Sequence, residues 1–323
     1  MELKHPIEPG SIGTLGHDLA RPECVLATRQ GDLYVSHRGA GITHIRPDGQ
    51  QQFIGAHAQI EGHEFVPNGF CMLPGGDFLI ANIGEAGGVW RMTPKGELSP
   101  FLREADGIAM AVANFVMNDE LGRVWITVST RMQPRYLSYR PNVADGFIVL
   151  VDGRGARIVA EGLAFTNEVR LGDAGASLYV SETFGRRISR FAIGKDGALQ
   201  SRSTFAEFGH GDFPDGIAFD AEHALWVTSI VSNRLYRVTR DGAVRKVLED
   251  SDAAHVAWVE FDLQAGKMGR EHFYTAKSEK LKNTASLAFG GPDLKTVYMG
   301  SLLDDRLISF RSAVAGVPMS HWG

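Results

Sequence analysis

Short hydrophobic runs recur along the chain and predict a repeated β unit. One pattern of β-branched and aromatic residues, ending in a small or hydroxyl residue, occurs six times, over residues 31–36, 76–81, 122–127, 176–181, 223–228 and 295–300. Runs of this composition are typical of strands that are buried on both faces. The chain is therefore expected to contain six similar β units.

A second strand and a tight turn follow most copies of the pattern. The second strands are expected over residues 41–45, 88–92, 146–150, 187–191 and 234–238. Turn dipeptides such as Asp48-Gly49 and Asp241-Gly242 supply the positive φ that hairpins need. A fourth strand is expected over residues 51–54, 156–160 and 203–208. Four-stranded units spaced by roughly 45 residues predict an all-β fold, a six-bladed β-propeller with antiparallel blades around a central channel.

The whole chain, residues 1–323, is expected to form one propeller domain. The last unit has no clear fourth strand, because the tail after Ala313 contains Gly316 and Pro318. We therefore expect the segment before Leu19 to supply the missing strand and close the ring. An insertion of about residues 248–282 precedes the last blade, and both a lid over the channel and a surface excursion are compatible with it.

Composition excludes several classes of protein. Hydrophobic residues make up 44% of the chain, charged residues 22%, and there are 38 glycines, as in a globular protein rich in turns. The net charge of -5 and the absence of a Lys/Arg cluster argue against nucleic acid as a partner. No apolar stretch is long enough to cross a membrane, and two cysteines suit a reducing compartment. We expect a cytoplasmic protein, and no feature indicates its oligomeric state.

Polar residues recur at one position of the strand that precedes each pattern and that should line the channel. The same offset reaches five of them, with a shift of one residue for the fourth: Glu23, Asn68, Asn114, Asn167 and Asp215. The sixth blade lacks an obvious counterpart. Strand interiors disfavour Asn and Asp, and buried acceptors need a partner. A partner common to all five side chains is therefore expected on the channel axis.

Carboxylate and amide oxygens that converge on an axis favour one hard divalent cation. Ca²⁺ fits first, and Mg²⁺, Mn²⁺ or Zn²⁺ is an alternative, although no set of Cys or His side chains favours Zn²⁺. The alternative is a water-filled channel in which Asn68-Gly69 and Asp215-Gly216 form ordinary turns. That alternative does not extend to Glu23 or Asn167, because neither precedes a glycine.

Several of these residues lie in motifs that resemble a known family. The motifs are Pro22-Glu23, Asn114 ahead of Gly122-Arg123, the run 162–167 ending in Asn167, Pro214-Asp215-Gly216 and the run 289–293. Together they resemble the SMP-30/gluconolactonase/luciferin-regenerating enzyme family, which consists of six-bladed metal-dependent propellers and includes lactone hydrolases. The resemblance extends over most of the chain.

The resemblance implies that Glu23, Asn167 and Asp215 bind the metal directly and that Asn114 reaches the metal or the substrate. It also implies hydrolysis of a small-molecule lactone. The metal would polarise the carbonyl, and Asp215 would assist the attack of water and return a proton to the leaving alkoxide.

Some positions depart from the family pattern. Val112, Phe115 and Met132 are apolar where sugar-lactone hydrolases of this family tend to hold substrate hydroxyls with polar groups. We therefore predict a substrate less hydroxylated than gluconolactone. Asn68 is a further candidate for substrate contact. Among the histidines, His63 and His210 are the best such candidates, while His57 and His255 are interpreted as surface or supporting residues.

Two other functions are compatible with a propeller. The first is a metal-free lyase or synthase like strictosidine synthase, which metal content would distinguish. The second is a non-enzymatic interaction module, since a fold does not fix a function. Five acceptors inside the channel argue against the module, because partner binding on an outer face requires no such ring.

Overall fold

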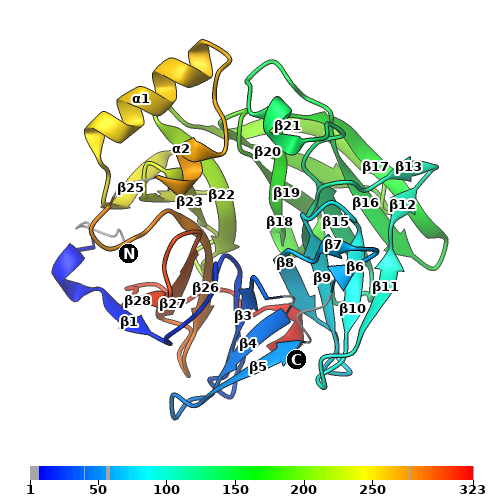
Figure 1. The fold of residues 1–323 in the computed structure, drawn as a ribbon, viewed down its shortest axis with the longest axis horizontal. Helices are drawn as coiled ribbons and strands as arrows, with labels where there is room; N and C mark the ends of the chain where they lie inside the picture. The colour runs from blue at the N-terminus through cyan, green and yellow to red at the C-terminus, as the bar shows by residue number, and fades with distance from the viewer. Residues whose placement is uncertain (1–6, 40, 56–58, 276–277, 323) are drawn as a thin grey trace.

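Six four-stranded antiparallel sheets radiate from a common axis in the computed structural model of the chain (Figure 1). The structure describes residues 7–39, 41–55, 59–275 and 278–322. The sheets are the blades of a six-bladed β-propeller, so the predicted fold class is confirmed.

The innermost strand of each blade lines the axis. These strands are β2 (Val25–Ala27), β8 (Pro67–Met72), β14 (Ala113–Asn118), β18 (Thr166–Gly172), β22 (Asp212–Phe219) and β26 (Thr284–Gly290). They pack side by side, and β14 contacts both β8 and β18. Residues near the start of each strand therefore meet around the axis.

The recurring pattern forms the second strand of each blade. These strands are β3 (Leu33–His37), β9 (Phe78–Asn82), β15 (Val124–Val128), β19 (Ser177–Glu182), β23 (Leu225–Val231) and β27 (Thr296–Ser301). In β9 the alternate residues Phe78 and Ile80 belong to one hydrophobic cluster, and Leu79 and Ala81 belong to the next. The strand is thus buried on both faces, as its composition predicts, and the core lies between adjacent blades.

The two outer strands complete each blade. The third strands are β4 (Gly41–Ile45), β10 (Val89–Met92), β16 (Gly146–Asp152), β20 (Arg187–Ile193), β24 (Arg234–Val238) and β28 (Leu307–Arg311). The fourth strands are β5 (Gln51–Gly55), β11 (Leu98–Leu102), β17 (Gly155–Leu163), β21 (Leu199–Glu207), β25 (Val244–Glu249) and β1 (Gly13–Leu15). Strand β1 pairs with β28, so the N-terminal segment closes the ring as expected.

A few elements lie outside the blades. Two hairpins are formed by β6 (Gln59–Ile60) with β7 (His63–Glu64) and by β12 (Glu104–Ala105) with β13 (Ile108–Ala109). The insertion before the last blade contains α1 (Ala253–Gln264) and α2 (Glu271–Tyr274), both beside β23 (Figure 1). Neither helix of the described residues is long and apolar enough to cross a bilayer.

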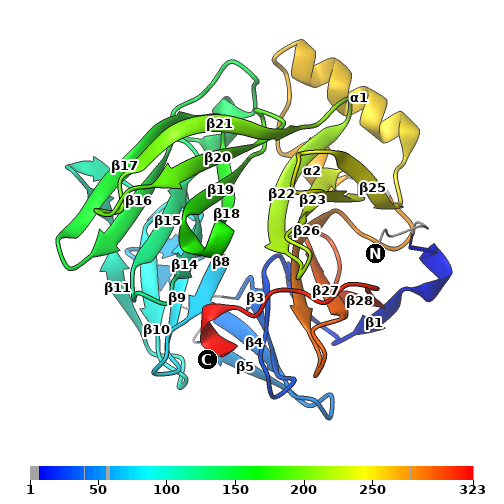
Figure 2. The ribbon, with the colours of Figure 1, turned by 180° about the vertical axis from the view of Figure 1, so that it is seen from behind.

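The C-terminal tail crosses the end of the propeller where the innermost strands finish (Figure 2). The N–H of Val317 donates to the oxygen of Phe219 at the end of β22. The indole N–H of Trp322 donates to the oxygen of Ala27 at the end of β2, 2.7 Å away, and Trp322 is buried. The tail therefore covers one end of the channel.

Two buried aspartates fix the turns between innermost and second strands. Asp220 accepts the backbone N–H groups of Glu222 and Ala224, and its other oxygen accepts from Trp226 Nε1 at 2.9 Å and from Arg237 Nε at 2.7 Å. Asp119 binds its own turn and Trp125 in the same way. Each aspartate joins a turn to a tryptophan between blades.

We expect Asp220→Ala to lower the free energy of unfolding by about 3 kcal/mol, because it leaves Arg237 Nε and the buried indole N–H of Trp226 without their acceptor, although Arg237 Nη2 keeps Glu222. Asp48→Ala is the matched control, since Asp48 accepts one backbone N–H in an exposed turn, and it should cost less than about 1 kcal/mol. Denaturant unfolding measures both changes, and equal losses in the two variants would contradict the assignment.

Candidate metal and substrate site

A β-bulge recurs near the start of the innermost strands and turns the acceptors toward the axis. In β8, Pro67 pairs with Asn82 and Phe70 with Ile80, so Asn68 and Gly69 lie opposite a single residue. Such a bulge re-aims a side chain without ending the strand. Equivalent shifts occur in β14, β18, β22 and β26. In the sixth blade the bulge contains Ala285 and Ser286, so Ala285 occupies the position that lacked an obvious counterpart.

Two cavities lie one behind the other along the axis, and the five predicted acceptors line both. The upper cavity contains about 580 Å³ of space, counting the part open to solvent, and the lower about 180 Å³. The residues common to both linings are Glu23, Asn68, Asn114, Asn167 and Asp215. The structure thus brings the five acceptors together as a ring between the two cavities.

The glycines that follow Asn68 and Asp215 are needed for close packing at this ring. A Cβ atom on Gly69 would lie 2.2 Å from the Phe115 ring, and one on Gly216 would lie 2.5 Å from the Cα of Ser286. Both pairs lie within strands and not in hairpin turns. The interpretation of Asn68-Gly69 and Asp215-Gly216 as ordinary turns is therefore wrong, because the glycines allow neighbouring strands to approach.

Hydrogen bonds orient the amides of the ring. Asn68 Nδ2 donates to the backbone oxygen of Asn114 at 2.9 Å and to its Oδ1 at 3.2 Å. Asn68 Oδ1 accepts from Arg21 Nη1 at 3.1 Å. Asn167 Nδ2 donates to Thr183 Oγ1 at 3.2 Å, and no hydrogen bond joins its Oδ1 to another of the described residues.

The carboxylates of Glu23 and Asp215 lack adequate partners. Both residues are more than nine-tenths buried. Glu23 forms an ion pair with Arg21, yet its Oε2 makes no well-formed hydrogen bond. Burial, and then the charges of Glu23 and Glu168, raise the pKa of Asp215 well above its ordinary value. Concentrated negative charge of this kind is stabilised by a cation.

The ring fits a hard divalent cation better than zinc. Two carboxylates and the Oδ1 of Asn167 are oxygen donors, the ligands that Ca²⁺ and Mg²⁺ prefer. Among the described residues, no three side chains of His, Cys, Asp or Glu converge to form a denser site. Glu23, Asn167 and Asp215 are the residues that would hold an ion, and Asn114 lies beside them.

A buried ion pair lies below the ring. Glu168 lines the lower cavity, and Arg170 Nη2 is 2.8 Å from its Oε2. Burial raises the pKa of Glu168 to about 7 despite the opposing effect of Arg170. The Arg170 guanidinium lies 4.6 Å from the centre of the Phe115 ring. This layer separates the ring from the C-terminal tail.

The walls of the upper cavity come from two long excursions. The insertion before the last blade contributes Arg270, Phe273 and Tyr274, and the loop between β15 and β16 contributes Arg135 and Tyr139. The rings of Tyr139 and Phe273 meet edge to face with centroids 5.1 Å apart. The insertion was expected to be either a lid over the channel or a surface excursion. Part of it forms a wall of the upper cavity, so it is not a remote surface excursion.

Four residues predicted to contact substrate lie elsewhere. Neither cavity, as far as the described residues form it, is lined by Val112, Met132, His63 or His210. Val112 is buried beneath the loop after β15, where its oxygen accepts from Ser129, and Met132 is partly exposed. His63 pairs with Glu85 at 2.9 Å. Phe115 lines the lower cavity only.

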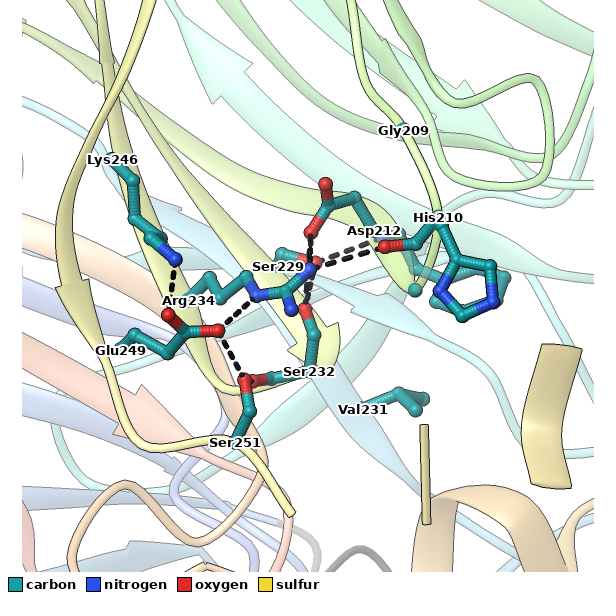
Figure 3. A network of polar contacts seen from close by, with 12 residues as sticks. Gly209, His210, Asp212, Ser229, Val231, Ser232, Arg234, Lys246, Glu249 and Ser251 are labelled. Atoms are coloured by element: carbon teal, nitrogen blue, oxygen red, sulfur yellow. Dashed lines mark hydrogen bonds and ion pairs between the residues drawn. The ribbon is translucent and has the colours of Figure 1, made fainter. Parts of the chain in front are cut away.

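His210 lies at the edge of a polar network around Arg234 (Figure 3). Its backbone oxygen accepts from Arg234 Nη1 at 3.1 Å, and Arg234 also pairs with Asp212 and Glu249. This network ties β24 to β22 and β25. His255 is buried in α1, where its Nε2 lies 3.0 Å from the backbone oxygen of His272, and His57 lies outside the described residues.

Arg135, Tyr139, Arg270 and Phe273 are cavity residues that the sequence argument missed. They lie in excursions that have no counterpart in the other blades. Counting back from the recurring hydrophobic pattern, which found the ring residues, therefore cannot find them. The length of the insertion was the single signal that pointed to any of them.

The fold and the site together define a propeller with an acidic, amide-lined centre. Residues 22–264 match the SMP-30/gluconolactonase/LRE-like region, so the chain belongs to that family.

Individual relatives share the fold across long stretches. The chain is 26% identical over 235 residues to a 6-deoxy-6-sulfogluconolactonase of Pseudomonas putida, covering 72% of this chain and 67% of the relative. A gluconolactonase of Xanthomonas campestris superposes with a TM-score of 0.69 at 17% identity, covering 95% and 94% of the two chains. Regucalcin of Agrobacterium tumefaciens, a calcium-binding protein, gives 0.64 at 14% identity, covering 95% and 96%.

We expect Asp215→Asn to have opposite effects on stability with and without a divalent cation. In chelator it should raise the free energy of unfolding by about 1 kcal/mol, because it removes a buried charge that faces Glu23. With Ca²⁺ at about 100 times its Kd, the unchanged protein should gain about 2.7 kcal/mol and the variant should gain little.

Thermal unfolding and calorimetric titration with Ca²⁺ measure these changes. Asp241→Asn is the matched control, because Asp241 lies in an exposed turn of the same blade. A Ca²⁺-dependent gain that survives Asp215→Asn would contradict the placement of an ion at the ring.

Proposed function

We propose that the protein is a metal-dependent lactonase whose active site is the ring between the two cavities. The observation that supports this most is the pair of buried carboxylates, Glu23 and Asp215, at the floor of an open cavity. Family membership and the lactonase name of the Pseudomonas putida relative support the same reaction class. The side chains that would hold the ion offer only oxygen donors, and this favours Ca²⁺, with Mg²⁺ and Mn²⁺ as alternatives.

A divalent cation held by Glu23, Asn167 and Asp215 would supply Lewis-acid polarisation of a lactone carbonyl. The chain itself would supply the proton transfers. Asp215 is the candidate base, because its carboxylate lines the floor of the upper cavity beside the other residues that would hold the cation. Asp215 would accept a proton from the attacking water and return it to the leaving alkoxide.

Arg21 and Asn114 would position these groups. Arg21 pairs with Glu23 and donates to Asn68, so it holds one side of the ring in place. The Asn114 side chain receives the Asn68 amide, so its orientation depends on the neighbouring blade. Asn68 therefore acts on the ring through its neighbours, while it still lines the cavity that would hold substrate.

The alternatives make different demands on the ring. A metal-free lyase or synthase would leave Glu23 and Asp215 uncompensated at the floor of the cavity, which burial disfavours. An interaction module would not require the upper cavity. Both alternatives predict that a chelator leaves the function of the protein unchanged.

We expect Asp215→Asn to lower kcat for lactone hydrolysis by about 10²–10⁴-fold, because the amide cannot accept the proton of water. A chelator should abolish hydrolysis by the unchanged protein, and added Ca²⁺ should restore it. A panel of lactones followed by pH-stat titration measures the rates, and Asp241→Asn is again the control. Full activity in metal-free protein would reject the metal-dependent reaction.

The walls of the upper cavity favour a substrate with few hydroxyl groups on one side. Phe165, Phe184 and Ile230 line it, and their side chains offer no hydrogen bond to a polyol. The prediction of a less hydroxylated lactone thus stays a prediction. Its support moves from Val112, Phe115 and Met132 to these residues.

We expect kcat/KM for an alkyl-substituted lactone to exceed that for glucono-δ-lactone by about tenfold, because desolvated hydroxyl groups would lack partners against this wall. Ile230→Thr should narrow the preference, because it shortens an apolar side chain of the wall and adds a hydroxyl group. Val244→Thr, on an exposed strand position, is the control. A preference for glucono-δ-lactone would contradict the prediction.

A further inference from the structure

Three guanidinium groups line the upper cavity, and two of them lack an acidic partner. Arg21 pairs with Glu23 at the ring. Arg135 and Arg270 also line the cavity, and neither forms an ion pair with a carboxylate among the described residues. Elsewhere in the chain arginine is commonly paired, as in Arg91 with Asp77. Arg135 contacts the Tyr139 hydroxyl and Arg270 the Tyr136 ring, but neither contact neutralises a positive charge, so the two groups can still bind an anion.

The two arginines lie on the excursions that form the cavity mouth. Arg135 begins the short helical turn Arg135–Ser138, and Arg270 directly precedes α2. The Arg270 guanidinium lies 5.8 Å from the centre of the Tyr136 ring, so the two excursions meet at this point. The Tyr139 and Phe273 rings pack beside them. Both positive groups thus line the cavity from two excursions that contact each other.

The charge of the cavity is opposite in sign to the charge of the chain. The whole sequence has a net charge of -5. The upper cavity is lined by three arginines and by the carboxylates of Glu23 and Asp215, which gives three positive against two negative groups. A divalent cation at the ring would make the cavity more positive still. A positive cavity in an acidic protein attracts and orients an anion.

We propose that Arg135 and Arg270 bind an anionic substituent of the lactone substrate, a carboxylate, sulfonate or phosphate group remote from the reacting carbonyl. The proposal rests on the lactonase function proposed above. Guanidinium groups recognise all three anions through paired hydrogen bonds. The ring would hold the carbonyl end of the substrate, and the arginines would hold its charged end at the mouth.

The test uses pairs of lactones that differ in charge. One pair is γ-butyrolactone and its γ-carboxy derivative, and the other series is glucono-δ-lactone with its 6-phospho and 6-deoxy-6-sulfo derivatives. The γ-butyrolactone pair isolates the effect of charge, because neither lactone has a free hydroxyl group. In the gluconolactone series, the charged group takes the place of the 6-hydroxyl, and the other three hydroxyl groups are unchanged. Comparison between the series shows which anion is preferred.

The variants are Arg135→Gln and Arg270→Gln, with Arg270→Lys as the conservative change. Arg140→Gln is the matched control, because Arg140 is exposed on the same loop as Arg135 and does not line the cavity. We expect each glutamine variant to lower the ratio of anionic to neutral kcat/KM by about tenfold, chiefly through KM, since a charge-assisted hydrogen bond is lost. Arg270→Lys should recover part of the ratio, and high salt should reduce it.

Binding without catalysis provides an independent readout. Tetrahydrofuran-2-carboxylate and tetrahydrofurfuryl alcohol contain no lactone bond and differ in charge, and both can be titrated by calorimetry. We expect the carboxylate to bind more tightly than the alcohol, and the difference to shrink in the two glutamine variants. A purely structural role of the arginines would weaken both ligands equally and would overturn the proposal.

The two proposals fail in different ways. Hydrolysis of neutral and anionic lactones at equal kcat/KM, unchanged in the ratio by either variant, would overturn the anion site and leave the lactonase standing. Absence of hydrolysis with every lactone and metal would overturn the lactonase. The anion site serves a lactone substrate, so loss of the lactonase function would overturn the anion site as well.

Discussion

The cost of burying carboxylates at the centre of a ring of strands is the constraint on which this structure depends. Glu23 and Asp215 are almost fully buried, and the ion pair of Glu23 with Arg21 offsets only part of this negative charge. Charges in such surroundings must be neutralised or paired, or their pKa values shift. The raised pKa of Asp215 is the direct result of this constraint. A bound cation would resolve it.

The propeller repeat makes this arrangement possible. The innermost strands β8, β14, β18, β22 and β26 each have a bulge near their start, and glycine at Gly69 and Gly216 lets adjacent strands approach where a Cβ would collide. The ring is thus a product of strand packing around the axis, and it is stiffened where Asn68 bonds across blades to Asn114. A site built on paired strands holds its ligands more firmly than a site built on loops.

The sequence predicted the parts of the molecule that repeat. The period of the hydrophobic pattern predicted the blades. A constant offset from it located Glu23 and Asp215 at the ring, and a shift of one residue located Asn167. The cavity walls could not be found in this way, because Arg135 and Arg270 lie in excursions whose paths depend on tertiary packing. Proximity along the chain was also a poor guide, since His63 and His210 precede ring residues closely but diverge from the axis into other contacts.

The floor and the walls of the cavity therefore have separate origins and can change separately. The floor is fixed by packing of six strands, so a substitution there disturbs neighbouring blades as well as the chemistry. The two excursions that form the walls meet through a few contacts, such as Tyr139 with Phe273, and none of the five ring residues belongs to them. Because the C-terminal tail and the Glu168–Arg170 layer cover the other end of the channel, a ligand reaches the ring past these walls. Recognition of the ligand must then occur at the mouth, where Arg135 and Arg270 provide the charge and the aromatic residues provide the shape.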